Sequence, residues 1–191
     1  MTRYALFTDR DGTLNYDPGY LGDPDSVKLY PGVIQGIKTL KSQLNFKVIV
    51  ISNQSGITRN LISSDQVDQV NRRINDILNV AGTSIDAFYF CPFHPDFDPP
   101  EKCKCRKPSP ELVLKAVQEH QIDLSKSYFI GDSQVDIECG YNSGLKTILI
   151  RNTLDEVEIK GLQKQINSPN FVADNFLEGI QFIINDFLGE N

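Results

Sequence analysis

Short apolar runs alternate along the chain with longer segments in which apolar residues recur every three or four positions. The runs themselves have no helical spacing, which is typical of strands buried on both faces of a parallel sheet. They lie at residues 4–7, 47–51, 86–90, 127–130, 146–150 and 171–173. Helical periodicity falls between them, at residues 33–44, 67–78, 111–121, around 137, 154–166 and 177–187. This alternation predicts an α/β protein with one parallel sheet between two layers of helices.

Turn and capping residues mark where several of these elements begin or end. Glycine and proline are dense between residues 15 and 30, which predicts tight turns there and no helix. Ser63 and Gln66 form a capping-box pair, and Ser109 followed by Pro110 predicts the start of another helix. Residues 92–108 contain five prolines, too many for regular secondary structure.

Composition and charge narrow the possible partners. A chain of 191 residues is long enough for one core, and we expect a single domain over residues 1–191. The formal net charge of -6 argues against a nucleic acid or an anionic membrane, but not against a small anionic substrate in a local pocket. No apolar run approaches the roughly 20 residues of a membrane span, and the first residues lack the apolar stretch of a signal peptide. We therefore expect a cytoplasmic protein, and we expect a monomer.

Polar side chains follow four of the predicted strands, where open α/β sheets place their ligands. Two carboxylates one residue apart repel each other unless a cation or a shared proton intervenes, and Mg²⁺ suits such a pair. Taken alone, they could equally be solvated acids in a turn. The four strand ends together supply a nucleophile, a second carboxyl, a hydroxyl and a cation, which suffice for phosphoryl transfer through an aspartyl-phosphate. These residues are Asp9 with Asp11, Ser52 with Asn53, Arg106 with Lys107, and Asp132 with Asp136.

The order of these motifs resembles the haloacid dehalogenase (HAD) superfamily of phosphatases. The matching segments are Asp9-Arg10-Asp11-Gly12-Thr13, Ser52, Lys107 and Gly131-Asp132. Asn53-Gln54-Ser55-Gly56-Ile57 and Cys103-Lys104-Cys105-Arg106-Lys107-Pro108 further resemble the subgroup that contains D-glycero-D-manno-heptose-1,7-bisphosphate phosphatases and histidinol-phosphate phosphatases. The resemblance implies a three-layer α/β/α, Rossmann-like HAD fold with a metal-binding Cys/His loop. The motif spacing leaves no room for a separate cap domain.

The resemblance also implies a catalytic role for each matching residue. Asp9 would attack phosphorus and become the aspartyl-phosphate. Asp11 would protonate the leaving oxygen and then act as base on the attacking water. Ser52 would donate a hydrogen bond to a phosphoryl oxygen, and Lys107 would neutralise the charge that builds there.

Magnesium would be held by Asp9, by the backbone carbonyl of Asp11 and by Asp132, as the resemblance implies. Asp136 would support Lys107 or the waters on the metal, with no direct bond to the metal. Arg10 has no chemical step in this scheme, and we expect it to form a salt bridge.

Substrate choice rests on segments that the resemblance places at the pocket. We expect Arg106 to contact a distal phosphate, because a guanidinium can donate two parallel hydrogen bonds to it. A solvated surface charge is the alternative for Arg59 and Arg106. The expected reaction removes the 7-phosphate of D-glycero-D-manno-heptose 1,7-bisphosphate; histidinol phosphate or another small sugar phosphate is the alternative. The expected substrate-binding residues are Asp17, Gly19, Tyr20, Asn53, Gln54, Ser55, Arg59 and Arg106.

Clustered cysteines point to a second, structural metal. Cys91, Cys103 and Cys105 surround His94, and without a signal peptide such a cluster indicates Zn²⁺ before a disulfide. In the family that the chain resembles, however, the histidine stands one residue earlier, where this chain has Phe93. Either His94 replaces it as the fourth ligand, or the zinc site is lost.

A phospho-receiver domain is the main non-enzymatic alternative. It too carries acids, a hydroxyl and a lysine at the strand ends of a doubly wound sheet, but it lacks the second acid of the Asp-x-Asp-Gly-Thr turn. A mutase that uses the same intermediate must shield it from water, usually with a cap, and this chain is too short for one. Asp11 therefore favours a phosphatase.

Overall fold

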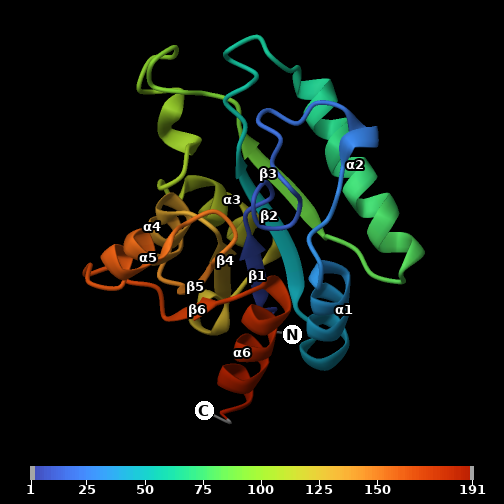
Figure 1. The fold of residues 1–191 in the computed structure, drawn as a ribbon, viewed down its shortest axis with the longest axis vertical. Helices are drawn as coiled ribbons and strands as arrows, with labels where there is room; N and C mark the ends of the chain where they lie inside the picture. Colours follow the sequence, from blue (N-terminus) through green and yellow to red (C-terminus); the bar gives the residue numbers. More distant parts are fainter. Residues whose placement is uncertain (1–2, 190–191) are drawn as a thin grey trace.

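A parallel sheet forms the centre of the protein. In a computed structural model, residues 3–189 are described, and within them six strands form one sheet in the order β3-β2-β1-β4-β5-β6 (Figure 1). Every neighbouring pair of strands is parallel. The strands are β1 (Ala5–Thr8), β2 (Lys47–Asn53), β3 (Ala87–Cys91), β4 (Tyr128–Gly131), β5 (Lys146–Ile150) and β6 (Phe171–Ala173). The predicted parallel α/β fold is confirmed.

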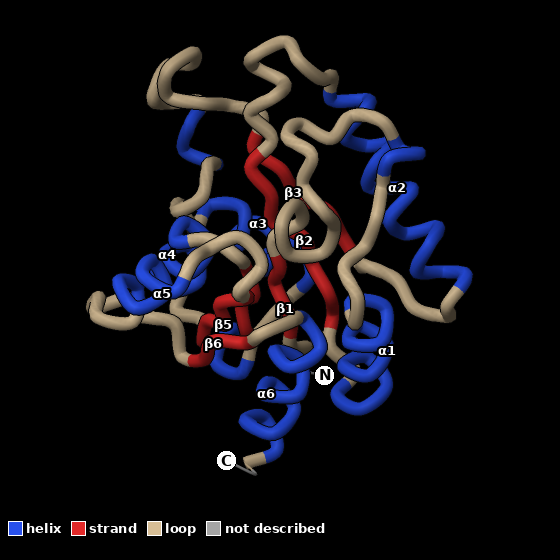
Figure 2. The backbone as a smooth tube through the Cα atoms, viewed as in Figure 1, coloured by secondary structure: helices blue, strands red, loops and turns tan. Residues whose placement is uncertain are grey.

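Helices cover both faces of this sheet, so that the fold has three layers (Figure 2). The helices α1, α2 and α6 pack on one face, against strand residues such as Leu6 and Val48. On the other face α3 and α4 pack against Phe7 and Ile49, and α5 packs against Leu149. Both faces are buried, which explains why the strands are apolar at successive positions. The helices are α1 (Val33–Leu44), α2 (Ser64–Val80), α3 (Glu111–His120), α4 (Gln134–Asn142), α5 (Glu156–Leu162) and α6 (Phe176–Leu188).

The register of the central strands aligns their carboxyl ends. Thr8, the last residue of β1, pairs with Val50 of β2 and with Ile130 of β4. Asp9 therefore leaves the sheet beside the ends of both neighbouring strands. The loops that follow β1, β2 and β3 lie together at the upper end of the sheet in Figure 1. This edge is where the predicted site residues meet.

Most element boundaries agree with the sequence to within two residues. The capping box of Ser63 and Gln66 is present at the start of α2. The N-cap of α3 is Pro110 and not Ser109 as predicted, although the Ser109 hydroxyl does accept the Glu111 N–H at 3.3 Å. The helix predicted over 154–166 is shorter, and the proline-rich loop contains one 3₁₀ turn, Cys103–Cys105. None of the helices between residues 3 and 189 has the length and apolar character needed to cross a membrane.

Candidate active site

The four strand ends converge on one pocket at the carboxyl edge of the sheet. Its volume is about 470 Å³. The pocket collects acidic, amide, hydroxyl and cationic side chains from segments that are far apart in the sequence, as the sequence analysis predicts. The lining residues are Asp9, Asp11, Asp17, Gly19, Tyr20, Ser52, Asn53, Gln54, Ser55, Arg106, Lys107, Ser133, Val135 and Asp136.

Lys107 lies between two carboxylates. Its Nζ donates to Oδ1 of Asp9 and to Oδ1 of Asp136, at 2.6 Å in each case, and its side chain is only 2% exposed. Asn53, at the end of β2, holds the Lys107 backbone: its Nδ2 donates to the Lys107 carbonyl at 3.2 Å, and its Oδ1 accepts the Lys107 N–H at 3.0 Å. Burial alone would lower the pKa of Lys107, but Asp136 and Asp9 raise it above its ordinary value. Lys107 is therefore a fixed positive charge at this site.

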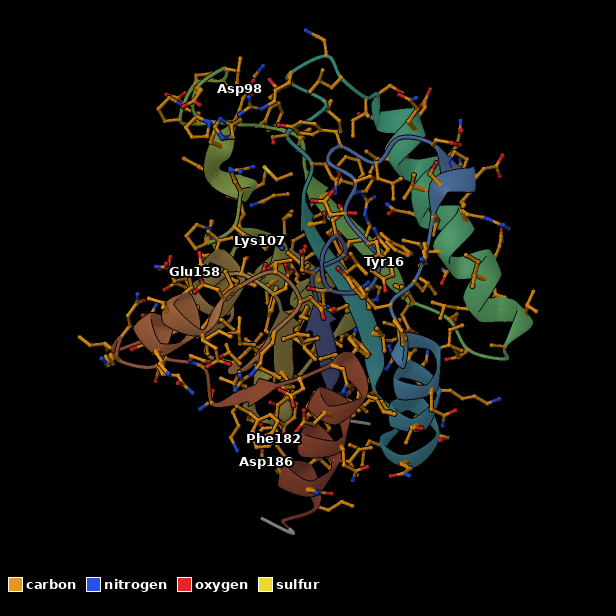
Figure 3. All side chains as sticks on the ribbon, viewed as in Figure 1. Tyr16, Asp98, Lys107, Glu158, Phe182 and Asp186 are labelled. Carbon is orange, nitrogen blue, oxygen red and sulfur yellow. A yellow bond between two sulfur atoms is a disulfide. The ribbon has the colours of Figure 1, made fainter. Side chains whose placement is uncertain are left out.

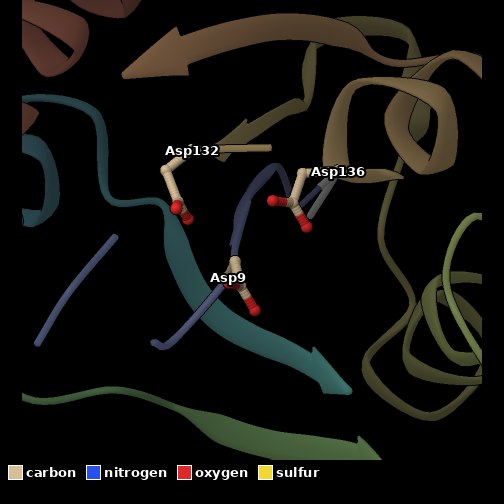
Figure 4. A group of neighbouring side chains, drawn as sticks. All are labelled: Asp9, Asp132 and Asp136. Carbon is tan, nitrogen blue, oxygen red and sulfur yellow. The ribbon is translucent and has the colours of Figure 1, made fainter. Parts of the chain in front are cut away.

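Three carboxylates surround a common point next to this lysine. Asp9, Asp132 and Asp136 each have an oxygen within 4.8 Å of the other two (Figure 4). Burial raises the pKa of Asp9 well above its ordinary value, and Lys107 offsets this only in part because the neighbouring carboxylates raise it further. Burial and the charge of Asp136 likewise raise the pKa of Asp132 to about 6. A cluster of oxygen ligands with excess negative charge suits a hard divalent cation such as Mg²⁺.

Asp132 is held by two threonines. Oγ1 of Thr13 donates to one carboxylate oxygen at 2.7 Å, and Oγ1 of Thr153, in the loop after β5, donates to the other at 2.8 Å. Gly12 lies directly against this carboxylate with a φ of +82°, so a Cβ at position 12 would be strained and would collide with it. The glycine of the Asp-x-Asp-Gly-Thr turn therefore makes room for Asp132.

Asp11 has partners different from those of Asp9. Nε of Arg10 donates to both carboxylate oxygens at 3.1 Å, and its Nη2 donates to Oδ2 at 2.8 Å, which confirms the predicted salt bridge. Asn15 donates to Oδ1 at 2.9 Å, and Gln54 donates to Oδ2 at 2.7 Å. Burial would raise the pKa of Asp11, but the positive charge of Arg10 lowers it, and so do the hydrogen bonds from Arg10, Asn15 and Gln54. The two acids of one turn are thus placed in opposite electrostatic environments.

Gln54 connects the ends of β1 and β2. Besides its contact with Asp11, its Nε2 donates to Oγ of Ser52 at 2.6 Å. Both Gln54 and Ser52 are buried. Gln54, predicted from the sequence to bind substrate, therefore also orients two of the predicted catalytic side chains.

The turn after Tyr16 forms part of the pocket rim. Oδ1 of Asp17 accepts the Gly19 N–H at 2.7 Å. The ring of Tyr20 packs over Gly56, where an added Cβ would come within 2.7 Å of the ring. Asp17, Gly19 and Tyr20 thus line the pocket, and Tyr20 also contacts the loop that follows β2.

Two arginines stand at different distances from the pocket. Arg106 lines it, and its Nη1 donates to the Phe93 carbonyl at 3.4 Å. Burial, and the nearby positive charge of Arg59, lower the pKa of Arg106. Arg59 itself lies over the ring of Phe97, with 4.6 Å between its guanidinium carbon and the ring centre, and is not among the lining residues. Its buried Nε has no hydrogen-bond partner within residues 3–189.

The zinc site predicted from the sequence is not formed. Cys91 and Cys105 are joined in a disulfide, and sulfurs that are bonded to each other are not thiolate ligands for zinc. Cys103 is a free thiol, and Nδ1 of His94 accepts a backbone N–H two residues further on, at 3.2 Å. These residues do not fit a tetrahedral zinc, so the prediction is corrected. The spacing could not separate the two outcomes, because nearby cysteines suit a disulfide as well as a metal.

The same loop is also tied to the loop after β2. Asp98 accepts the Thr58 hydroxyl at 2.6 Å and the His94 N–H at 3.0 Å (Figure 3). The disulfide joins residue 105 to the end of β3. Arg106 and Lys107 therefore follow directly after a loop that is fixed at two points.

Several residues that hold the site together were not predicted from the sequence. Asn71 on α2 accepts a hydrogen bond from Arg10, and Thr153 holds Asp132. Asn71 had a signal, because it is a polar residue beside Val70 and Ile74 on the buried face of the helix, where an amide needs a hydrogen-bond partner. Thr153 had none, since nothing in its local sequence distinguishes it from an ordinary loop residue.

Comparison with known proteins identifies the family of this chain. Residues 104–179 match the family model described as "HAD-hyrolase-like". The D-glycero-D-manno-heptose-1,7-bisphosphate 7-phosphatase of Chlorobaculum tepidum is 37% identical over 185 residues, which cover 92% of this chain and 92% of that protein. The D-glycero-beta-D-manno-heptose-1,7-bisphosphate 7-phosphatase of Helicobacter pylori (strain ATCC 700392 / 26695) is 38% identical over 156 residues, 80% of this chain and 87% of that protein.

A solved structure has the same fold. The crystal structure of D,D-heptose 1,7-bisphosphate phosphatase from B. bronchiseptica, complexed with magnesium and phosphate, superposes with a TM-score of 0.83 at 23% identity. The match covers 96% of this chain and 99% of that one. From its sequence identity to the curated relatives, from its fold and from its pocket, the chain belongs to the HAD-like phosphatases, in the family of the D-glycero-D-manno-heptose-1,7-bisphosphate 7-phosphatases.

Proposed function

We propose that the protein is a Mg²⁺-dependent phosphatase that works through an aspartyl-phosphate and removes the 7-phosphate of D-glycero-D-manno-heptose 1,7-bisphosphate. The observation that carries the proposal is the position of Asp9 in the pocket. Its carboxylate contacts Nζ of Lys107 and lies beside Asp132 and Asp136, where a divalent cation would fit. Asp11, two residues further on, lines the same pocket and is the second carboxyl that proton transfer needs.

In the first step, Asp9 is the nucleophile. Its carboxylate oxygen forms a bond to phosphorus while the bond between phosphorus and the sugar oxygen breaks. Arg10 lowers the pKa of Asp11 in the free protein, whereas the negative charge of a bound phosphate would favour its protonated form. Asp11 then gives a proton to that leaving oxygen, so the sugar departs as an alcohol. Lys107 and the hydroxyl of Ser52 stabilise the charge on the phosphoryl oxygens.

In the second step, a water molecule attacks the phosphorus of the aspartyl-phosphate. Asp11, now ionised, takes a proton from the water, and the bond between phosphorus and Asp9 breaks. Inorganic phosphate leaves, and both carboxyl groups return to their starting states. The hydrogen bonds from Asn15 and Gln54 would hold Asp11 in place through both steps.

Asp9 and Asp132 are the side chains that would hold the magnesium ion, with the backbone carbonyl of Asp11. The carboxylates fit such an ion, because oxygens of Asp9, Asp132 and Asp136 lie within 4.8 Å of one another and together carry more negative charge than Lys107 can balance. A bound Mg²⁺ would supply the missing positive charge, which keeps Asp9 ionised and withdraws charge from the phosphoryl group. Asp136 would act on Lys107, whose Nζ it contacts, and its other oxygen accepts hydrogen bonds from Ser133.

The choice of substrate is supported by the relatives and by the second cation in the pocket. Curated relatives at 37% and 38% identity carry the heptose-bisphosphate name. Arg106 lines the same pocket as Asp9 and would bind the phosphate that is not removed. Histidinol phosphate has one phosphate and so would offer Arg106 no second phosphate to bind.

A substrate panel tests the proposal. D-glycero-D-manno-heptose 1,7-bisphosphate, fructose 1,6-bisphosphate and histidinol phosphate are compared by phosphate release in the presence of Mg²⁺. The heptose bisphosphate should give the highest kcat/KM, and a higher value for histidinol phosphate would contradict the substrate assignment.

The mechanism is tested separately with Asp9→Asn. This variant should release no phosphate from any member of the panel, because an amide cannot form the acyl-phosphate. The matched control is Asp68→Asn, an exposed acid on α2, which should keep full activity. Phosphate release by the Asp9 variant at the rate of this control would remove Asp9 as the nucleophile.

A further inference from the structure

Arg10 is buried although it is charged. Its side chain is 1% exposed, and in the sequence it stands between Asp9 and Asp11, just after β1. A buried guanidinium is stable only when its N–H groups have partners, because an unpaired buried charge costs several kcal/mol. The hydrogen-bond partners of these N–H groups therefore indicate the role of Arg10.

The two ends of the guanidinium have different partners. Nε and Nη2 donate to the carboxylate of Asp11, at 2.8 to 3.1 Å. On the other end, Nη1 donates to Oδ1 of Asn71 at 3.0 Å. Arg10 thus connects the Asp11 carboxylate to a side chain 61 residues away in the sequence.

Asn71 gives Arg10 a hydrogen-bond acceptor outside its own turn. Asn15 and Gln54 each donate to one oxygen of Asp11, but neither contacts Arg10. The salt bridge joins two neighbours on one turn, so it does not by itself fix the guanidinium, from which Asp11 accepts three further hydrogen bonds. Asn71 belongs to α2, which begins with a complete capping box and packs on the sheet through Val70 and Ile74. The amide is 7% exposed and therefore offers Arg10 an acceptor on a firmly packed helix.

We propose that Asn71 is a positioning residue for the general acid: it anchors Arg10, and Arg10 in turn aims the Asp11 carboxyl at the leaving oxygen. The inference rests on the proposed role of Asp11 in proton transfer. Loss of Asn71 would leave Asp11 in the pocket but allow its carboxyl group to move away from the line to that oxygen.

A comparison of substrates with different leaving groups can detect such a displacement of the Asp11 carboxyl group. A sugar alkoxide is a poor leaving group and needs its proton from Asp11, whereas 4-nitrophenolate leaves without one. The ratio kcat/KM covers the reaction up to departure of the leaving group, and the second step does not enter it. A misaimed acid therefore lowers kcat/KM for the sugar phosphate and spares it for 4-nitrophenyl phosphate.

The experiment measures kcat/KM of the full-length protein, with Mg²⁺, for heptose 1,7-bisphosphate and for 4-nitrophenyl phosphate. Asn71→Leu should lower the first value by about 10-fold or more, within the total contribution of a general acid, and change the second by less than about 2-fold. Asn71→Ala is made beside it, because its smaller side chain is tolerated if leucine prevents folding. Asn71→Asp keeps an acceptor oxygen for Nη1 and should restore the sugar phosphate value.

Asn75→Leu is the matched control. Asn75 lies one turn further along α2 and holds the Ile85 backbone: its Oδ1 accepts the Ile85 N–H at 2.8 Å, and its Nδ2 donates to the Ile85 carbonyl at 3.1 Å. Its replacement removes a similar hydrogen-bonding amide from the same helix without touching Arg10. It should lower both kcat/KM values equally or leave both unchanged.

Two results overturn the inference. If Asn71→Leu and Asn71→Ala change both kcat/KM values equally or not at all, as the control does, Asn71 has only a structural role. Asp11→Asn, measured on the same two substrates, shows whether the proposed function itself holds. Selective loss in Asp11→Asn without selective loss in the Asn71 variants overturns the positioning role alone; no selective loss in Asp11→Asn overturns both.

Discussion

Nζ of Lys107 lies 2.6 Å from Oδ1 of Asp9, although 98 residues separate the two in the sequence. The amide of Asn53 makes this contact possible, because it bonds both the N–H and the carbonyl of Lys107. The lysine thereby places one positive charge against both Asp9 and Asp136. The proposed phosphoryl transfer needs a positive charge at the carboxyl edge of the sheet, and Lys107 supplies it.

Replacement of Lys107 by methionine should lower kcat by about 10²–10³-fold, the usual loss when one donor to a developing charge is removed. Methionine keeps much of the buried volume, so the change is mainly one of charge and hydrogen bonding. Phosphate release from the sugar bisphosphate measures it. Lys104→Met, an exposed lysine of the same loop, is the control and should keep its activity. Equal rates for the two variants would count against the role of Lys107.

Arg106→Ala should discriminate between bisphosphates and monophosphates. A charged hydrogen bond to phosphate is worth about 1.5–3 kcal/mol, so kcat/KM for heptose 1,7-bisphosphate should fall by about 10–100-fold. A monophosphate that lacks the distal group should be hydrolysed at an unchanged kcat/KM. The measurement is a parallel titration of both substrates with wild type and variant. A similar loss for both would show that Arg106 acts on the transferred phosphate or on the loop.

The stabilising contribution of Asp86 should be lost in acid. Burial would raise the pKa of Asp86, but hydrogen bonds from Lys41, from the Val48 N–H and from Lys47 lower it below its ordinary value. A carboxyl whose pKa is lower in the folded than in the unfolded state stabilises the fold above its unfolded pKa, and this contribution is lost as the pH falls through its folded pKa.

Urea unfolding of Asp86→Asn checks this sign. At about pH 7 the variant should be less stable than wild type by about 1 kcal/mol, a modest value because Asp86 and both lysines are partly exposed. At about pH 3, below the ordinary pKa of an aspartate, the difference should be smaller, because the unfolded wild-type chain binds a proton there more readily than the folded one. Asp68→Asn provides the comparison for an exposed acid. A difference that grows on acidification would contradict the lowered pKa.

The disulfide between Cys91 and Cys105 predicts the thiol count. Of the four cysteines, Cys103 and Cys139 are free. Unfolded, unreduced protein should therefore react at two thiols with a thiol reagent, and after reduction at four. Metal analysis of the purified protein should find no stoichiometric zinc. Four thiols before reduction, together with one bound zinc, would reverse the correction and restore the metal site.

Local patterns were enough for the order and nature of the elements. The strand predicted over 146–150 is the observed β5, and the capping box of Ser63 and Gln66 begins α2 as expected. The strand ends that carry Asp9, Ser52 and Asp132 meet at one edge because every strand of the sheet is parallel. Periodicity and capping depend on residues a few positions apart, so they can be read directly from the chain.

Contacts between distant segments were not predictable in the same way. The acceptor that anchors Arg10 is on α2, and the threonine that completes the partners of Asp132 is Thr153, beyond β5. The pairing of Cys91 with Cys105 is of the same kind, because their spacing alone permits either a metal or a disulfide. Each of these contacts depends on how helices and loops pack on the sheet, which a single sequence does not show.

In the turn after β1, some features are determined by the local sequence and others only by folding. The sequence alone determined that two acids follow a buried strand, because the apolar run and the Asp-x-Asp-Gly-Thr motif are local. Only the tertiary structure decided that Asp9 would contact Lys107 and that Asp11 would contact Arg10, Asn15 and Gln54. The physical reason is that the properties of a carboxylate depend on its burial and on the charges and donors around it, and these come from segments that meet only when the chain folds.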